Sequence, residues 1–131
     1  MDVAIIGLGS LGSVTAKRLS RIRGITLKLY DRDYVEFSNL SRQPFYDKAD
    51  VGKTKSEAAV SKLKNAKGFF LEVTKDSITQ IGKPGVLICL TDNMENKFLV
   101  NDYCKKNKIK AIFGSAIEDR AMIFIKNPFL K

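Results

Sequence analysis

Apolar and polar residues alternate along the chain in blocks that predict strands and helices in turn. Short, uniformly apolar runs stand at VAII (residues 3–6) and VLICL (residues 86–90). Such runs are typical of strands buried on both faces of a parallel sheet. ITLKLY (residues 25–30) and FFLEVT (residues 69–74) predict two further strands. Glycines follow VAII at once, which favours this run as the first, central strand.

Three stretches between these runs show helical spacing. Residues 10–22 place apolar side chains at roughly helical intervals, with Lys and Arg gathered in the last turns, where the helix dipole favours cations. Gly24 is expected to end this helix. KSEAAVSKLKN (residues 55–65) predicts a second helix, and residues 95–107 predict a third. The third helix is expected to pack on the sheet through Phe98, Leu99 and Tyr103.

KAIFGSA (residues 110–116) and AMIFI (residues 121–125) predict two final strands around IEDR. So short a connection permits only an antiparallel pair. The complete order is strand, helix, strand, helix, strand, strand, helix, strand, strand, an α/β pattern with right-handed crossovers. The sequence therefore predicts a Rossmann-like three-layer α/β fold with a mostly parallel sheet and an antiparallel C-terminal strand.

Composition narrows the class of protein. The chain has 131 residues, which predicts a single domain over residues 1–131. Hydrophobic residues make up 44% of the chain and charged residues 28%, a composition typical of soluble globular proteins. No run approaches ~18 apolar residues and the N-terminus lacks a basic region, so neither membrane spanning nor secretion is expected. Cys89 and Cys104 form no CxxC pair, so neither a disulfide framework nor a structural zinc site is expected, and a reducing, cytoplasmic location is. Cys89, in an apolar strand, is expected in the core, and Cys104, on a helix, is expected to be structural.

Charge points towards an anionic partner. Lys and Arg number 23 against 14 Asp and Glu, a net charge of +9, which favours a nucleotide, an acidic protein or nucleic acid. Scattered lysines equally suit a surface adapted for solubility. The sequence holds no RGG tract, basic block or interleaved aromatic and basic residues, so nucleic-acid binding is not expected.

Gly7, Gly9 and Gly12 form a G-x-G-x-x-G pattern between a predicted strand and a predicted helix. The first glycine permits a tight turn, the second lets phosphate approach the backbone, and the third lets helix and strand pack closely. Asp31, nineteen residues after Gly12, is expected to accept hydrogen bonds from ribose hydroxyls. The pattern predicts an adenine nucleotide without distinguishing NAD, FAD and ATP; a tight turn without ligand is the alternative.

The residue types available elsewhere separate hydride transfer from nucleotidyl transfer. A dehydrogenase needs a proton-transfer group and a substrate site, and this chain has no histidine and no predicted second domain. Nucleotidyl transfer instead needs cations to neutralise a triphosphate and a carboxylate to hold Mg²⁺. The residues of this chain therefore suit nucleotidyl transfer better than hydride transfer.

Groups suited to these tasks follow the predicted second and fourth strands. Arg42 can grip phosphate oxygens with its planar fork, and Lys53 or Lys55 can add a point charge at the start of the next helix. Asp92 stands after the fourth strand and is expected at the same crevice. The neutral hydrogen-bonding residues of the loop are Asn39 and Gln43.

Four motifs stand in this order: GLGSLGS, DRDYVEFSNLSRQ, VGKTK and LTDN. Their combination and separations resemble the ThiF/MoeB/HesA family of adenylating enzymes, relatives of the ubiquitin-activating enzymes, and FGSAIEDRAMIFI resembles the strands that follow there. The resemblance implies a homodimeric, ATP- and Mg²⁺-dependent adenylyltransferase. Its substrate would be the C-terminal glycine carboxylate of a ubiquitin-like sulfur-carrier protein ending in Gly-Gly, as in thiamine or molybdopterin sulfur transfer.

The same resemblance implies roles for individual residues. Asp31 becomes the ribose contact, Asp33 a neighbouring support, and Asp92 the Mg²⁺ ligand. The family lysine is the last residue of VGKTK, which favours Lys55 over Lys53. The implied phosphate ligands are Asn39, Arg42, Gln43 and Lys55. Catalysis is expected to rest on Arg42, Lys55 and Asp92.

The ends of the chain leave other functions open. The sequence starts at the first predicted strand and stops soon after the last, so a short or truncated member without the family's C-terminal region is expected. A non-catalytic nucleotide-binding partner subunit is one alternative. An NAD(P)-linked oxidoreductase, resting only on the glycine pattern and Asp31, is another.

Overall fold

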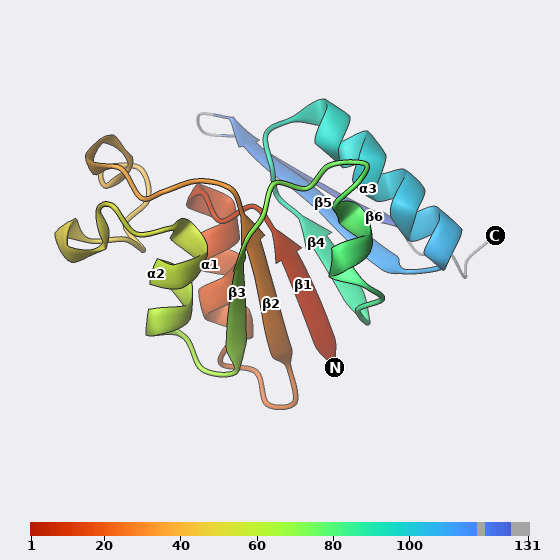
Figure 1. Ribbon diagram of the computed structural model, residues 1–131, viewed down its shortest axis with the longest axis horizontal. Coiled ribbons are helices and arrows are strands. Elements are labelled where there is room, and N and C mark those ends of the chain that lie inside the picture. The colour runs from red at the N-terminus through yellow and green to blue at the C-terminus, as the bar shows by residue number, and fades with distance from the viewer. Residues whose placement is uncertain (118–119, 127–131) are drawn as a thin grey trace.

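A six-stranded sheet forms the middle of the molecule. The computed structural model describes residues 1–117 and 120–126. The strands follow the order β3-β2-β1-β4-β5-β6 across the sheet (Figure 1). Their bounds are β1 Asp2–Ile6, β2 Thr26–Asp31, β3 Ala66–Phe70, β4 Val86–Cys89, β5 Lys110–Ile117 and β6 Arg120–Lys126. Neighbouring strands run parallel except β5 and β6, so the predicted antiparallel C-terminal strand is confirmed.

Helices cover both faces of this sheet. The bounds are α1 Ser10–Leu19, α2 Lys55–Lys62 and α3 Met94–Asn107, with single 3₁₀ turns η1 Phe37–Asn39, η2 Lys48–Asp50 and η3 Ile78–Ile81. Helices α1 and α2 lie on one face and α3 on the other (Figure 1). Successive residues of β1 pack into hydrophobic cores on opposite faces of the sheet. Ile5 clusters with Ala16 and Ala59, whereas Ile6 clusters with Val100. The predicted three-layer α/β fold is confirmed.

The third strand lies earlier in the chain than FFLEVT predicted. β3 pairs with β2 from Ala66 to Phe70, and the last pair joins Phe70 to Asp31. Because β2 ends at Asp31, only one further hydrogen bond continues the ladder, from the Leu71 N–H to the Asp31 carbonyl at 3.1 Å. The predicted strand over residues 69–74 is therefore wrong after residue 70, and the remaining residues enter the loop at the carboxyl edge of the sheet.

The first two helices end earlier than predicted. In the chain after α1, the Arg21 and Ile22 N–H groups bond to carbonyls three residues back, which tightens the turn and stops the helix. Gly24 lies beyond this turn, with a φ of +88°, and does not itself end α1. Helix α2 stops at Lys62 rather than residue 65.

Helix α3 packs on the sheet through two of the three residues predicted. Phe98 is 63% exposed, so its predicted core role is wrong. Leu99 and Tyr103 pack against the core as expected, beside the buried residues Val100 and Cys104. Among the described residues, no helix has both the length and the apolar composition needed to cross a bilayer.

Both cysteines are free and buried, which confirms the core position predicted for Cys89. Cys89, the last residue of β4, and Cys104 on α3 belong to one core cluster. Burial raises the pKa of the Cys89 thiol and raises that of Cys104 to about 12. Such thiols stay protonated near neutral pH and are poor nucleophiles.

Candidate functional site

A cavity of about 1200 Å³ opens at the carboxyl ends of the parallel strands. It lies where the chain leaves β1 for a helix on one face and β4 for a helix on the other, the position where open α/β sheets bind ligands. Of the residues predicted for the site, the cavity lining includes Gly7, Gly9, Asp31, Asp33, Arg42, Gln43, Lys55 and Asp92. The fold thus brings together groups spread over most of the sequence.

The three glycines have the structural properties that their spacing predicted. Gly7 has a φ of +97°, and a Cβ there would lie 2.9 Å from the Leu90 carbonyl. A Cβ at Gly12 would lie 1.8 Å from the Gly7 carbonyl oxygen, so only glycine lets α1 approach the loop. At Gly9 the nearest atom to such a Cβ is Nε2 of Gln43, 3.9 Å away. The backbone at Gly9 therefore has room for a ligand.

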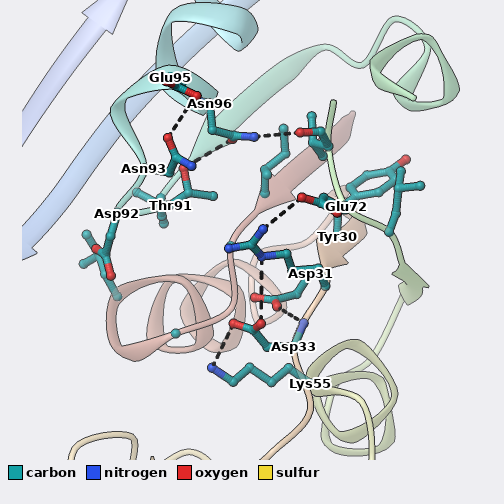
Figure 2. Close-up of a pocket in the computed structure, with 18 of the residues that line it drawn as sticks. Tyr30, Asp31, Asp33, Lys55, Glu72, Thr91, Asp92, Asn93, Glu95 and Asn96 are labelled. Carbon is teal, nitrogen blue, oxygen red and sulfur yellow. Dashed lines mark hydrogen bonds and ion pairs between the residues drawn. The ribbon is translucent and has the colours of Figure 1, made fainter. Parts of the chain in front are cut away.

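Asp31 stands at the end of β2 and holds the glycine loop. Its Oδ2 accepts a hydrogen bond from the Leu8 N–H at 2.7 Å. Its Oδ1 accepts one from the Asp33 N–H, also at 2.7 Å (Figure 2). Burial raises the pKa of the Asp31 carboxyl, although these two backbone donors partly oppose the shift. Each carboxylate oxygen can accept a further hydrogen bond. The residue can therefore position the loop and also receive a ribose hydroxyl.

Lys55 reaches the cavity from the first position of α2. Its side chain is only 7% exposed, and its Nζ lies 3.9 Å from Oδ2 of Asp33 (Figure 2). The Lys55 N–H bonds to the Asp33 carbonyl at 2.9 Å, so the backbone as well as the side chain is fixed. Lys53 is exposed and does not belong to the described lining of the cavity. The geometry therefore favours Lys55, as the motif did.

The loop before η2 brings two of its three predicted residues to the cavity. Arg42 is exposed and lines the cavity, whereas Gln43 is 8% exposed and its Oε1 has no hydrogen-bond partner among the described residues. Asn39 lies outside the described lining, because its side-chain oxygen caps η1 by accepting from the Glu36 N–H at 3.0 Å. Its carbonyl accepts from both the Arg42 and Gln43 N–H groups, so Asn39 shapes their turn.

Asp92 lies in the loop between β4 and α3, exposed and lining the cavity. No group of three or more Asp, Glu, Cys or His side chains able to hold a metal occurs within the described part of the chain. Mg²⁺ is commonly held by one or two carboxylates together with substrate phosphates and water. A single carboxylate at Asp92 fits a magnesium ion shared with phosphates and does not form a metal cage by itself.

The cavity wall opposite the glycine loop contains residues that the sequence did not single out. Asn96 donates from Nδ2 to the Val73 carbonyl at 2.8 Å and accepts at Oδ1 from the Thr91 hydroxyl at 3.3 Å (Figure 2). It thereby ties the start of α3 to the chain that follows β3. Asn93 caps α3 by accepting from the Asn96 N–H. The helix cap could have been predicted from the asparagine of LTDN, because asparagine is a common capping residue. The bond from Asn96 to the Val73 carbonyl could not.

An ion pair also crosses this wall. Arg32 Nη1 lies 2.9 Å from Glu72 Oε1, and both side chains are largely exposed. Glu72 follows β3 in the stretch that the sequence assigned to a strand, so its place at the cavity could not be predicted. An exposed pair of this kind contributes little to stability.

Comparisons with known proteins agree with this architecture. The ThiF family model matches residues 1–129. Sulfur carrier protein ThiS adenylyltransferase of Bacillus subtilis is 32% identical over 133 residues, covering 95% of this chain and 40% of that protein. Ubiquitin-like modifier-activating enzyme 5 of Oryza sativa subsp. japonica is 35% identical over 125 residues, covering 80% of this chain and 30% of the relative.

Solved structures show the same fold. The crystal structure of Escherichia coli MccB with succinimide superposes with a TM-score of 0.88 at 25% identity, covering 98% of this chain and 41% of that one. The chain therefore spans well under half the length of the proteins it matches. Since the family model covers nearly all of its residues, the chain belongs to the ThiF family.

Proposed function

We propose that residues 1–131 form the nucleotide-binding domain of an ATP-dependent adenylyltransferase that activates the C-terminal glycine carboxylate of a ubiquitin-like sulfur-carrier protein. One observation carries the proposal: the open glycine loop, Asp31, Arg42, Lys55 and Asp92 line the same cavity. The Bacillus subtilis relative is named as an adenylyltransferase, which supports the same reaction.

ATP fits the distribution of charge and space in this cavity. The ribose is assigned to Asp31, whose oxygens keep acceptor capacity. The phosphates are assigned to the backbone around Gly9, where a ligand has room, and to the cations Arg42 and Lys55. Gln43 adds a buried amide beside the loop, and its oxygen has no hydrogen-bond partner in the part of the chain that the structure describes. Its amide NH₂ is the predicted phosphate donor.

The reaction demands charge neutralisation more than proton transfer. An oxygen of the carrier's carboxylate forms a bond to the α-phosphorus, and the bond from that phosphorus to the bridging oxygen breaks. Pyrophosphate leaves with the electron pair, and an acyl adenylate remains. The nucleophile is already ionised at neutral pH, so the chain needs no general base and its lack of histidine is no obstacle. Arg42 and Lys55 would position the phosphates and offset their charge.

Magnesium is assigned to Asp92, which would hold the ion together with phosphate oxygens. When bound, the ion supplies a Lewis acid that offsets charge on the phosphates. Asp33 is assigned a supporting role, because its carboxylate lies beside the Lys55 amine. Asn39 is assigned to the phosphates through its amide NH₂, and its carbonyl also shapes the turn that presents Arg42.

The proposed substrate is a carrier ending in Gly-Gly. Support for a sulfur carrier comes from the name of the Bacillus subtilis relative, whereas the rice relative's name specifies a ubiquitin-like modifier. A pathway of the thiamine or molybdopterin type is therefore proposed, together with homodimerisation and a cytoplasmic location. The two buried, free cysteines are compatible with a reducing compartment.

Pyrophosphate exchange tests the proposal. The purified chain is incubated with ATP, Mg²⁺, labelled pyrophosphate and a carrier ending in Gly-Gly, and label entering ATP is counted. Exchange should depend on the carrier and vanish when the carrier lacks its terminal glycine. Intact ATP binding without exchange for any such carrier would favour the non-catalytic nucleotide-binding subunit instead. Binding of NAD(H) but not ATP in calorimetry would favour the oxidoreductase.

A further inference from the structure

The peptide at Leu8, between the first two glycines of the loop, is held from two sides. Tyr46 donates its hydroxyl hydrogen bond to the Leu8 carbonyl at 2.6 Å. Asp31 accepts from the Leu8 N–H at 2.7 Å. Glycine leaves the backbone free to adopt many conformations, and Gly7 and Gly9 flank this residue. Leu8 is therefore a point at which two side chains fix the loop from opposite sides of one peptide, in addition to the bond from the Ser13 hydroxyl to the Gly9 carbonyl.

Tyr46 itself is firmly placed. It is 3% exposed and packs in a small core cluster with Val35 and Ala58. Its backbone N–H bonds to the Gln43 carbonyl at 3.1 Å, which connects the ring to the turn that carries the proposed phosphate ligands. Burial raises the pKa of the Tyr46 hydroxyl, and the nearby Asp31 carboxylate adds to the shift. The hydroxyl therefore remains a donor at physiological pH.

A second anchor holds the chain just after Tyr46. Lys62 of α2 contacts Asp50 at 2.8 Å and Asp47 at 3.0 Å, and Asp50 is buried. The Asp47 N–H also bonds to Asp50 Oδ2. The chain carrying Tyr46 is thus attached to α2, the helix that begins with Lys55. Movement of this segment would move the glycine loop with it.

We infer that Tyr46 is a positioning residue whose hydroxyl holds the Leu8 carbonyl and keeps the glycine-loop backbone aligned for nucleotide phosphate with Arg42 and Gln43. The inference rests on the proposed function only in taking the ligand to be an adenine nucleotide. Without the hydroxyl, the loop samples other conformations, and apparent affinity falls in proportion to the competent fraction. The loss of affinity should be large for ligands that carry phosphate and small for the nucleoside alone.

The variant Tyr46→Phe tests this assignment, with Tyr103→Phe as the matched control. Tyr103 also donates its hydroxyl to a backbone carbonyl, that of Gly82, and lies outside the described lining of the cavity. Calorimetry would measure binding of Mg-ATP, AMP and adenosine to each protein. One hydrogen bond is worth about 1 kcal/mol, so Tyr46→Phe should weaken ATP and AMP about fivefold to tenfold and adenosine less than about twofold. Tyr103→Phe should change none of the three.

Equal ATP affinity of the wild type and a folded Tyr46→Phe would overturn the inference, as would equal losses for ATP and adenosine. Should Tyr46→Phe not fold, NMR of the wild type decides. A slowly exchanging Tyr46 hydroxyl proton near the Gly9 amide would support the inference that Tyr46 holds the Leu8 carbonyl. Absence of that proton signal would contradict the inference. A wild type that binds ATP without pyrophosphate exchange removes only the proposed function. A wild type that binds no adenine nucleotide removes both.

Discussion

The two walls of the cavity are built in different ways. The glycine wall, residues 7–12 with Asp31, is fixed at its main chain: two of its glycines leave no space for a Cβ, and the Asp31 carboxylate and the Tyr46 hydroxyl bond to the loop backbone. The far wall, residues 71–75 and 91–96, is held mainly by the bond from Asn96 to the Val73 carbonyl, and the exposed Arg32–Glu72 pair adds little. Substitutions should therefore cause large losses of stability or activity on the glycine wall and smaller, graded losses on the far wall.

The largest effect is expected at the glycine wall with Gly12→Ala. A Cβ there would lie 1.8 Å from the Gly7 carbonyl oxygen, so α1 and the loop must separate. Overpacking of this kind costs about 1–3 kcal/mol or more, a large part of the stability of a small domain. Circular dichroism should show an unfolded or strongly destabilised chain. Gly9→Ala is the control and should melt within a few degrees of the wild type, because its Cβ meets only Gln43 Nε2 at 3.9 Å.

Next in size are the losses expected from Arg42→Ala and Asp92→Ala, one residue from each side of the cavity. Both side chains are exposed, so thermal unfolding should stay unchanged. Removing one group that stabilises transferred charge should lower the exchange rate about 10²-fold to 10³-fold. Unfolding of Asp92→Ala would leave its role as metal ligand unsupported. An unchanged rate in folded Arg42→Ala would remove that residue from the phosphate site.

High pH should weaken the core beneath the far wall. Cys89 lies beside Thr91 and Asn96, and burial raises the pKa of both thiols, to about 12 for Cys104. A thiol with a raised folded pKa binds more protons in the folded state above its ordinary pKa of about 8.5, so stability falls as pH rises. For Cys104 the slope approaches about 1.4 kcal/mol per pH unit, and Cys89 adds in the same direction. Denaturant unfolding between pH 8 and 10 should show this fall in the free energy of unfolding. The same slope against pH in a folded Cys104→Ala variant would contradict the prediction.

The smallest effect is expected from Asn96→Ala on the far wall. Losing the bond to the Val73 carbonyl should lower stability by about 1 kcal/mol and loosen the chain after β3. The KM for ATP should rise a few-fold at a nearly unchanged kcat, because the wall is displaced while the glycine loop is not. Asn107→Ala is the control, since it removes a similar amide bond to the Tyr103 carbonyl on the same helix. Equal kinetic effects from both variants would show that the wall has no special role.

The same contrast explains what the sequence could and could not predict. The glycine wall was predictable because G-x-G-x-x-G is a local pattern with a local backbone consequence, and Asp31 ends the next strand. The end of β3 was not, because it depends on where its partner β2 stops. Asn96 and Glu72 could not be placed, since their partners lie 23 and 40 residues away.

Asn39 shows a limit of a different kind. Family resemblance implies a phosphate contact for it, and in the structure its oxygen caps η1 and it lies outside the described lining of the cavity. The cap leaves its amide NH₂ able to donate to a ligand, so the phosphate contact stays a prediction. Short polar side chains compete between local backbone capping and longer-range contacts, and sequence alone does not decide between them. Tyr46 is the opposite case: it has no motif, yet it bonds to the loop 38 residues before it.

Trapping of the acyl adenylate tests most directly whether this cavity joins ATP to a carboxylate. The chain is incubated with Mg-ATP, a Gly-Gly carrier and hydroxylamine, which converts an acyl adenylate to a hydroxamate, and the carrier is analysed by mass spectrometry. A hydroxamate confined to the carrier's C-terminal glycine, requiring ATP and absent with Arg42→Ala, is predicted. An unmodified carrier with a folded chain that binds ATP would contradict adenylation by this protein.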